Sequence, residues 1–160
     1  MKIVTHDGHF HGDEVFAVAI LLIKYPDAEV VRSRDPDIIT QGDIVLDVGH
    51  VYDPNLRRFD HHQPQGAGQR ENGIPFASSG LIWKHFGEQL VDDTDISTRL
   101  DEKFIQSIDA PDNGVSLFDV NERGISPVLI QDIVNGFKPE WGSAKSMDEG
   151  FLNACEFARG

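Results

Sequence analysis

Apolar residues in the first third of the chain fall into short β-branched runs and one longer run. Residues 3–5, 29–34 and 44–48 have the length and the β-branched content of strands. Residues 15–23 are apolar on every side, and their Ala, Ile and Leu content predicts a buried helix. This order of strand, helix, strand and strand predicts an α/β fold, with a parallel sheet and flanking helices.

Turn-forming residues divide the rest of the chain into a hairpin, a loop and further helices. Residues 52–59 fit a hairpin with an Asp-Pro-Asn turn, and the Gly-, Gln- and Pro-rich residues 63–75 fit a mobile loop. Four helices are expected: residues 81–86 ended by Gly87, residues 98 to about 108 after an N-cap at Ser97, residues 127–135 after an N-cap at Ser126, and an amphipathic stretch over residues 148–158.

The totals fit one soluble domain that fills residues 1–160. The 14 basic and 27 acidic residues give a net charge of −13, which argues against a broad face for duplex nucleic acid. A small anionic substrate held by metal ions remains compatible with this charge. Cys155 stands alone, so no disulfide framework is expected, and no segment is long enough to span a membrane. A reducing cytoplasm is the expected location.

Five of the seven histidines lie in two short segments. In the first segment, His6, His11 and Asp13 form a candidate set, with Asp7 and His9 as competing members. Imidazole and carboxylate donors without thiolate suit manganese, iron, zinc or magnesium. The alternative interpretation is a polar turn that happens to be rich in histidine.

The second segment is Asp60-His61-His62. Two adjacent histidines are seldom wanted in an interior, because each ring has two nitrogens that need partners. They make sense where one imidazole binds a metal and the next reaches a metal-bound anion, although a solvated loop is the alternative. Asp47, a lone acid at the end of an apolar strand, is a candidate ligand or an exposed strand cap.

Asp109 and Asp112 form the last set, and taken alone they are better explained by turn chemistry. Taken together, the four sets favour a single metal site. Ligands bind at the carboxyl ends of parallel strands, where His6 and Asp47 are expected. Four or more carboxylates gathered there would repel one another unless cations neutralise them. Two divalent ions suit such a site and the hydrolysis of phosphate esters.

Five ordered segments of the chain resemble a known family: THDGHFHGDEV, LDVGHVYDP, RRFDHHQ, FASSGLIWKHFG and DAPDNG. They occur in this order in the melanocyte-proliferating-gene (Myg) exonuclease family of the DHH phosphoesterase superfamily, and the resemblance covers residues 2–158. It implies a parallel-sheet α/β DHH domain with two divalent ions, most often Mn²⁺, with Mg²⁺, Zn²⁺ or Fe²⁺ as alternatives. It also implies that the chain is the N-terminal part of the family's length and lacks most of its C-terminal domain.

The resemblance implies a role for each motif residue. The implied metal ligands are His6, His11, Asp13, Asp47, His61 and Asp109. Asp47 would bridge the two ions, His62 would contact substrate phosphate or a metal, and Asp60 would orient a histidine from behind. Asp47, Asp60, His61 and His62 are thus the implied catalytic set. Asp112 rivals Asp109, and His9 looks like a variable position.

Two further residues are weaker candidates for phosphate contact. Ser79 would lie near a helix N-terminus, where helix capping explains it equally well. Arg58 precedes the Asp-His-His motif and could steer phosphate, with an ordinary solvated basic pair as the alternative. His11 stands where superfamily members more often have Asp, which implies a softer metal preference and greater sensitivity to acid.

The activity implied by the resemblance is 3′→5′ exonuclease action on RNA or short oligonucleotides by a metal-activated water. A second possibility keeps the site but changes the substrate to pyrophosphate, a cyclic dinucleotide or a nucleoside bisphosphate. A third is a metal-binding but catalytically idle fragment, because the resemblance implies that the family's closing domain is not part of this chain.

Overall fold

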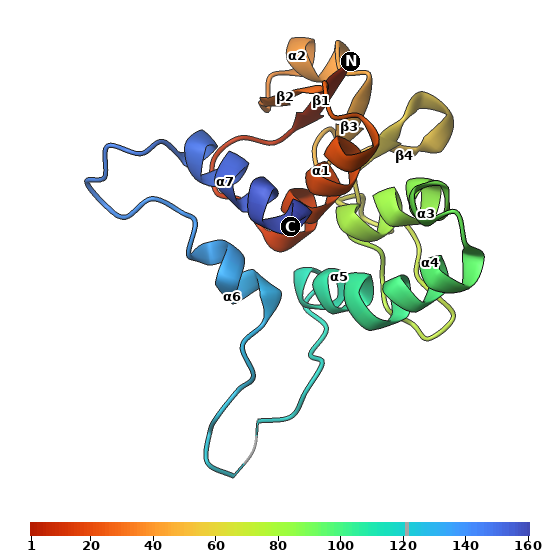
Figure 1. The fold of residues 1–160 in the computed structure, drawn as a ribbon, viewed down its shortest axis with the longest axis vertical. Coiled ribbons are helices and arrows are strands. Elements are labelled where there is room, and N and C mark those ends of the chain that lie inside the picture. Colours follow the sequence, from red (N-terminus) through yellow and green to blue (C-terminus); the bar gives the residue numbers. More distant parts are fainter. Residues whose placement is uncertain (121) are drawn as a thin grey trace.

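The computed structural model describes residues 1–120 and 122–160 and has an α/β fold with a five-stranded sheet (Figure 1). The sheet order is β2-β1-β3-β5-β4, for strands at Glu29–Arg32, Lys2–Thr5, Ile44–Leu46, Arg58–Phe59 and Tyr52–Asp53. The first four are parallel, and β4 joins β5 as the antiparallel arm of a hairpin. The predicted parallel sheet and the hairpin are confirmed.

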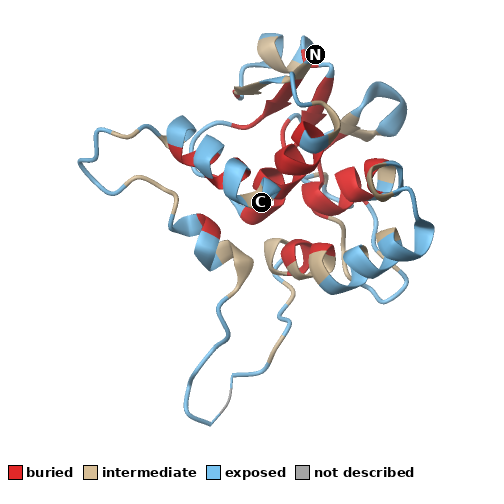
Figure 2. Cartoon of the chain, in the orientation of Figure 1, coloured by how far each residue is buried: buried red, intermediate tan, exposed pale blue. Residues whose placement is uncertain are grey.

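Helix α1 (Gly12–Lys24) connects β1 to β2 and lies at the centre of the fold. Its residues from Gly12 to Leu22 are buried, as its apolar sequence predicts. It packs against α3 (Ser78–Val91) and α7 (Met147–Arg159), and Figure 2 shows the buried residues concentrated in α1, α3 and the central strands. Among the described residues, no helix is both long enough and apolar enough to cross a membrane.

The register of the sheet explains where the polar residues gather. Ile3 of β1 pairs with Val30 of β2 on one side and with Ile44 of β3 on the other. These β-branched residues suit a sheet that is covered by helices. Because β1, β3 and β5 are parallel neighbours, their carboxyl ends lie side by side at one edge of the sheet.

The remaining helical elements are shorter. They are α2 (Pro36–Thr40), the 3₁₀ turn η1 (Pro54–Leu56), α4 (Thr94–Leu100), the π-helical turn η2 (Asp101–Ile105), α5 (Gln106–Asp112) and α6 (Ile130–Asn135). Helix α2 was not predicted, although Asp35 caps it by accepting the Asp37 N–H (2.9 Å) and Pro36 occupies its first turn.

Helix α3 does not end at Gly87, so that prediction is wrong. It continues to Val91 and stops where Asp92 takes the left-handed conformation (φ +51°). Gly87 is instead a site of close approach, since a Cβ there would lie 2.6 Å from two ring atoms of Trp83. Glycine therefore makes room for the Trp83 indole on the helix surface.

The helix predicted to start after Ser97 begins earlier and ends later. Asp93 is the N-cap of α4 and accepts the Ile96 N–H (2.9 Å), while Ser97 lies within the helix. The helical path continues through η2 into α5, so Asp109 and Asp112 lie on a helix and not in the predicted turn. This continuation brings α5 towards the sheet edge.

Helix α6 begins at Ile130, and the predicted start after Ser126 is wrong. Residues 124–129 have no regular structure, and the Asp132 carboxylate accepts the backbone N–H of Leu129 (2.8 Å) to cap the helix there. The predicted end near residue 135 and the final helix are confirmed by α6 and α7.

Candidate metal centre

Three neighbouring strands deliver polar side chains to the same edge of the sheet. His6 follows β1, Asp47 follows β3, and Asp60 and His61 follow β5. Asp47 Oδ2 lies 3.2 Å from His6 Nε2, and Asp47 Oδ1 lies 3.3 Å from His61 Nε2. The Asp47 carboxylate therefore stands between two imidazoles, with one oxygen facing each.

The N-terminus of α1 adds two buried carboxylates, those of Asp13 and Glu14. Glu14 accepts the His11 N–H with both oxygens (2.8 Å each), and its Oε1 lies 3.0 Å from His6 Nε2. Asp13 Oδ2 lies 3.7 Å from His61 Nε2. Glu14 was missed by the sequence analysis, although an acid in the first turn of a helix that starts at this edge was a usable signal.

Asp112 faces the cluster and Asp109 does not. Asp112 Oδ2 lies 3.2 Å from His61 Nε2. Asp109 is buried against α3, where its carboxylate accepts the Ser79 hydroxyl (2.5 Å), the Gly80 N–H (2.9 Å) and Arg70 Nη1 (2.8 Å). These bonds occupy Asp109 and Ser79, so the structure brings neither together with the strand-end residues.

Four overlapping groups of three side chains within the described residues could each hold an ion. In each group the ligand atoms lie within 4.8 Å of one another. The groups together comprise His6, His11, Asp13, Glu14, Asp47, His61, His62 and Asp112. Five of the six ligands expected from the sequence are among them, and Asp109 is in none.

Burial and neighbouring carboxylates both favour the neutral form of Asp13. Burial raises its pKa well above the ordinary value, and the neighbouring carboxylates of Asp47, Asp112 and Glu14 raise it further. Like charges this close disfavour one another in a buried site. A bound cation would relieve that repulsion.

The neighbouring carboxylates also raise the pKa values of the two buried imidazoles, His6 and His61. Burial alone would lower the pKa of His6, but Asp47 and Glu14 outweigh it and raise the value to about 10. His61 likewise reaches a pKa of about 10, because Asp112 and Asp47 outweigh its burial. Burial would raise the pKa of Asp47, but the two imidazoles hold it well below its usual range. Both histidines thus hold a proton that a metal ion could replace.

The residues present fit divalent ions. Asp13 Oδ1 and His61 Nε2 are buried and have no hydrogen-bond partner in the described part of the chain. His6 Nδ1 lies 2.8 Å from the Asp7 carbonyl oxygen, which leaves Nε2 directed at the carboxylates. Buried polar atoms without partners are costly, and this nitrogen and oxygen donor set matches manganese, iron, zinc or magnesium.

Asp60 supports the following histidine. Its carboxylate accepts the backbone N–H groups of His50 (2.7 Å) and His62 (2.9 Å), and Oδ1 lies 2.8 Å from His62 Nδ1. These bonds outweigh burial and lower the pKa of Asp60, while the bond to Asp60 raises the pKa of His62. The His62 side chain is 52% exposed, so the ring is held by Asp60 and reaches solvent.

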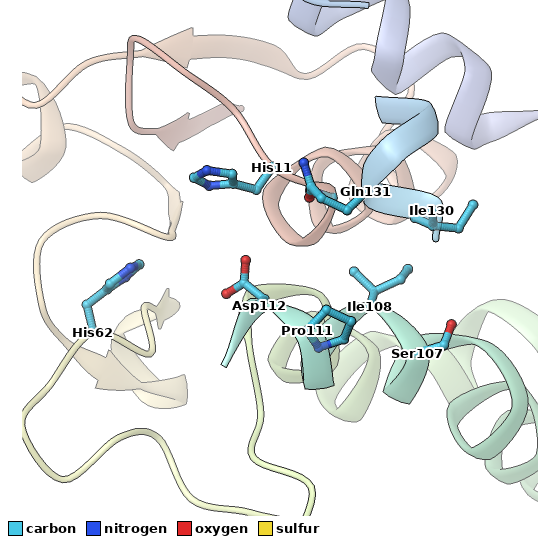
Figure 3. A pocket seen from close by; sticks show the side chains of 9 residues that line it. His11, His62, Ser107, Ile108, Pro111, Asp112, Ile130 and Gln131 are labelled. Carbon is cyan, nitrogen blue, oxygen red and sulfur yellow. The ribbon is translucent and has the colours of Figure 1, made fainter. Parts of the chain in front are cut away.

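Two hollows adjoin the cluster, and His11 and His62 line both. One hollow of about 320 Å³ lies between α5 and α6 (Figure 3). The other, of about 410 Å³, is lined by the loops after β1, β3 and β5 and includes His9, His50 and Arg34. Ser79 and Arg58 line neither, and the Arg58 guanidinium donates to the Leu56 carbonyl oxygen (3.0 Å).

The chain is similar over residues 2–160 to the family model MYG1_exonuc, described as "Uncharacterised protein family (UPF0160)". It is 36% identical to the human protein named MYG1 exonuclease, in an alignment that covers 99% of the chain and 48% of that protein. It is 34% identical to a MYG1 protein of Schizosaccharomyces pombe, with 99% of the chain and 54% of the relative covered. The chain thus spans about half the length of these curated relatives. No solved structure matches it.

Proposed function

The chain belongs to the MYG1_exonuc family, and we propose on that basis that its sheet-edge cluster holds two divalent ions and hydrolyses phosphodiester bonds. Relatives named exonucleases support a nuclease role for the family. For this chain we propose 3′→5′ cleavage of RNA or short oligonucleotides with Mn²⁺, in the cytoplasm. We further propose that residues 1–160 form one DHH-type metal-binding domain and that the rest of the relatives' length helps to hold substrate.

The observation that carries the proposal is the crowding of carboxylates around the buried side chains of Asp13 and His61. Asp13 Oδ1 has no hydrogen-bond partner among the described residues, and His61 Nε2 lies 3.2–3.7 Å from the carboxylates of Asp112, Asp47 and Asp13. A buried polar atom without a partner costs free energy, and a bound ion would recover that cost. Metal ions would satisfy both atoms and neutralise the carboxylates.

The ligands divide into two sides around Asp47. One side has His6 and Glu14 with His11 beside them, and the other has His61, Asp13 and Asp112. Asp47 would bridge the sides, because its two oxygens face different imidazoles. When bound, two such ions lower the pKa of a water and stabilise charge that develops on the phosphate.

The chain's own residues would bind and orient the phosphate. His62 is held through Nδ1 by Asp60, which leaves Nε2 for a substrate oxygen. Its raised pKa favours the cationic form, which donates a hydrogen bond to an anion more strongly than the neutral ring does. On the other flank, the larger hollow has Arg34, His9 and His50 as donors for further phosphates of a chain, although Arg34 also pairs with Asp7 (3.4 Å).

Incubation of the chain with Mn²⁺ and three separate substrates tests the function. We expect a ladder of shortened products from 5′-labelled RNA and turnover of bis-p-nitrophenyl phosphate, both abolished by EDTA. Phosphate release from pyrophosphate alone would select a small-anion hydrolase instead. If the chain binds ions but hydrolyses none of the three substrates, the result would support a catalytically idle metal-binding fragment.

The two acids of α5 offer a matched pair of variants. Asp112→Asn should lower the metal content, since it removes a carboxylate that lies 3.2 Å from His61 Nε2. Asp109→Asn should keep the metal content and lose stability instead, by roughly 1–3 kcal/mol, because Arg70, Ser79 and Gly80 share that carboxylate.

Elemental analysis after dialysis and urea unfolding in EDTA measure the two effects separately. The reverse pattern, with metal lost from Asp109→Asn and retained by Asp112→Asn, would restore Asp109 as the ligand.

A further inference from the structure

The hollow between α5 and α6 has two chemically different ends. The end next to the cluster is formed by His11, His62 and Asp112, and the far part is lined by Ile108, Pro111 and Ile130. Figure 3 shows Gln131 and Ile130 from α6 opposite Pro111 and Ile108 from α5, with His62 across the open side. A ligand in this hollow would touch His11, the proposed phosphate-binding residue His62 and an apolar wall at once.

A small inorganic anion has no use for such a wall. Phosphate and pyrophosphate are held by charge and hydrogen bonds, and contact with Ile108 or Ile130 would add nothing to their binding. The other hollow includes Arg34, His9 and His50, which can donate hydrogen bonds to an anion, beside the carboxylates of Asp7, Asp47 and Asp60. The apolar wall therefore favours a substrate in which a ring with apolar faces is joined to the phosphate through a sugar.

Resting on the proposed phosphoesterase function, we propose that this hollow binds the nucleobase of the nucleotide whose phosphate lies at the metal-ligating cluster. Its volume of about 320 Å³ is at the lower end of small-molecule sites, which span roughly 300–1,000 Å³. A base would stack on Pro111 and contact Ile108 and Ile130. The substrate class is then a nucleoside phosphodiester, and pyrophosphate is excluded as the preferred substrate.

The polar groups of the hollow are largely committed to protein partners. The Ser107 hydroxyl donates to the Phe104 carbonyl oxygen (2.6 Å). Gln131 Oε1 accepts the Gly12 N–H (2.6 Å), and its Nε2 donates to Asn135 Oδ1 (2.9 Å). Few free groups remain to form hydrogen bonds with the edge of a base and so distinguish one base from another. Stacking, in contrast, is possible with every base. The hollow should therefore bind purines and pyrimidines alike.

Gly12 fixes the position of the apolar wall. A Cβ at this residue would lie 3.3 Å from Gln131 Oε1 and 3.6 Å from Ile130 Cγ2. Helix α6 packs closely against the start of α1, where the Gly12 N–H donates to Gln131 Oε1. The wall is thus attached to the same helix start that carries Asp13 and Glu14.

Calorimetric titration of the Mn²⁺-loaded chain with AMP, CMP and ribose 5-phosphate tests the assignment. AMP and CMP should each bind about tenfold or more tightly than ribose 5-phosphate, because stacking adds to phosphate binding. In Ile130→Ser this advantage should shrink to about threefold or less, since apolar contact is lost while the charge is unchanged. Binding of ribose 5-phosphate should stay the same.

Ile133→Ser is the matched control. Ile133 lies on the same helix, is 41% exposed and does not line the hollow, so its replacement should leave the nucleotide advantage intact. Equal binding of AMP and ribose 5-phosphate by the wild-type chain, or equal losses in both variants, would overturn the nucleobase assignment and leave the proposed function standing. Failure of all three ligands to bind in a manganese-dependent way would overturn both.

Discussion

An Asp47→Asn variant should fold but lose at least one of the about two divalent ions that we expect in the wild-type chain. Asp47 is 3% exposed, and its two oxygens lie 3.2 and 3.3 Å from the Nε2 atoms of His6 and His61. The amide keeps the shape of the side chain but removes the charge and one ligand oxygen. Phosphodiesterase activity should fall roughly 10³-fold or more, because the ions contribute several kcal/mol of charge stabilisation.

Asp92→Asn is the matched control for the backbone. Asp47 and Asp92 both have a left-handed backbone, with φ of +54° and +51°, and asparagine tolerates this conformation as well as aspartate does. Asp92 is exposed at the end of α3, so its variant should keep its metal and its activity. Elemental analysis and circular dichroism separate metal loss from unfolding. A full metal complement in Asp47→Asn would contradict the bridging role.

Histidine titration gives a readout that does not depend on activity. In the metal-free wild type, the pKa values of His6 and His61 are raised from 6.5 to about 10, and Asp47 is a cause in both cases. A raised histidine pKa stabilises the fold below about pH 6.5, and this stabilisation is lost as the pH rises towards 10. Asp47→Asn should therefore lower both pKa values in NMR titrations and cost the metal-free chain more stability at pH 6 than at pH 10.

The sheet and α1 could be predicted because local preference and burial agree in those segments. Residues 15–23 are apolar on every side, and α1 is indeed buried along nearly its whole length. The helix end predicted at Gly87 and the helix start predicted at Ser97 were wrong, because the roles of these residues depend on tertiary contacts. The Trp83 indole covers Gly87 and donates to the Ser97 carbonyl oxygen (3.0 Å), so packing between α3 and α4 overrides both local signals.

The candidate site could be predicted where it depends on strand order and not where it depends on helix packing. His6, Asp47 and His61 follow parallel strands, so their meeting at one edge follows from topology. Glu14 and Asp112 come from α1 and α5, and only the approach of those helices brings them in. Spacing in the sequence could not show whether Asp109 or Asp112 faces the cluster. The difference depends on Arg70, which lies in a distant loop and pairs with Asp109.

Gly80→Ala should destabilise the chain by about 2–4 kcal/mol, although alanine is the better helix former by roughly 1 kcal/mol. A Cβ at this position of α3 would overlap Asp109 Oδ2 and lie 2.7 Å from Arg70 Nη2. Asp109 is fully buried and cannot move without breaking its ion pair with Arg70 and its bonds to Ser79 and the Gly80 N–H. The cost of a broken buried pair exceeds the gain in helix propensity.

Urea unfolding in EDTA measures this cost without a contribution from metal binding. Asp109→Ala provides the second arm of a double-mutant cycle, because it removes the carboxylate that the new methyl group would strike. The penalty of Gly80→Ala should then be much smaller in the Asp109→Ala background, where alanine's helix preference can act. Additive penalties would show that the clash with Asp109 is not the cause. Arg70 also pairs with Asp101, so it retains one carboxylate partner when Asp109 is replaced.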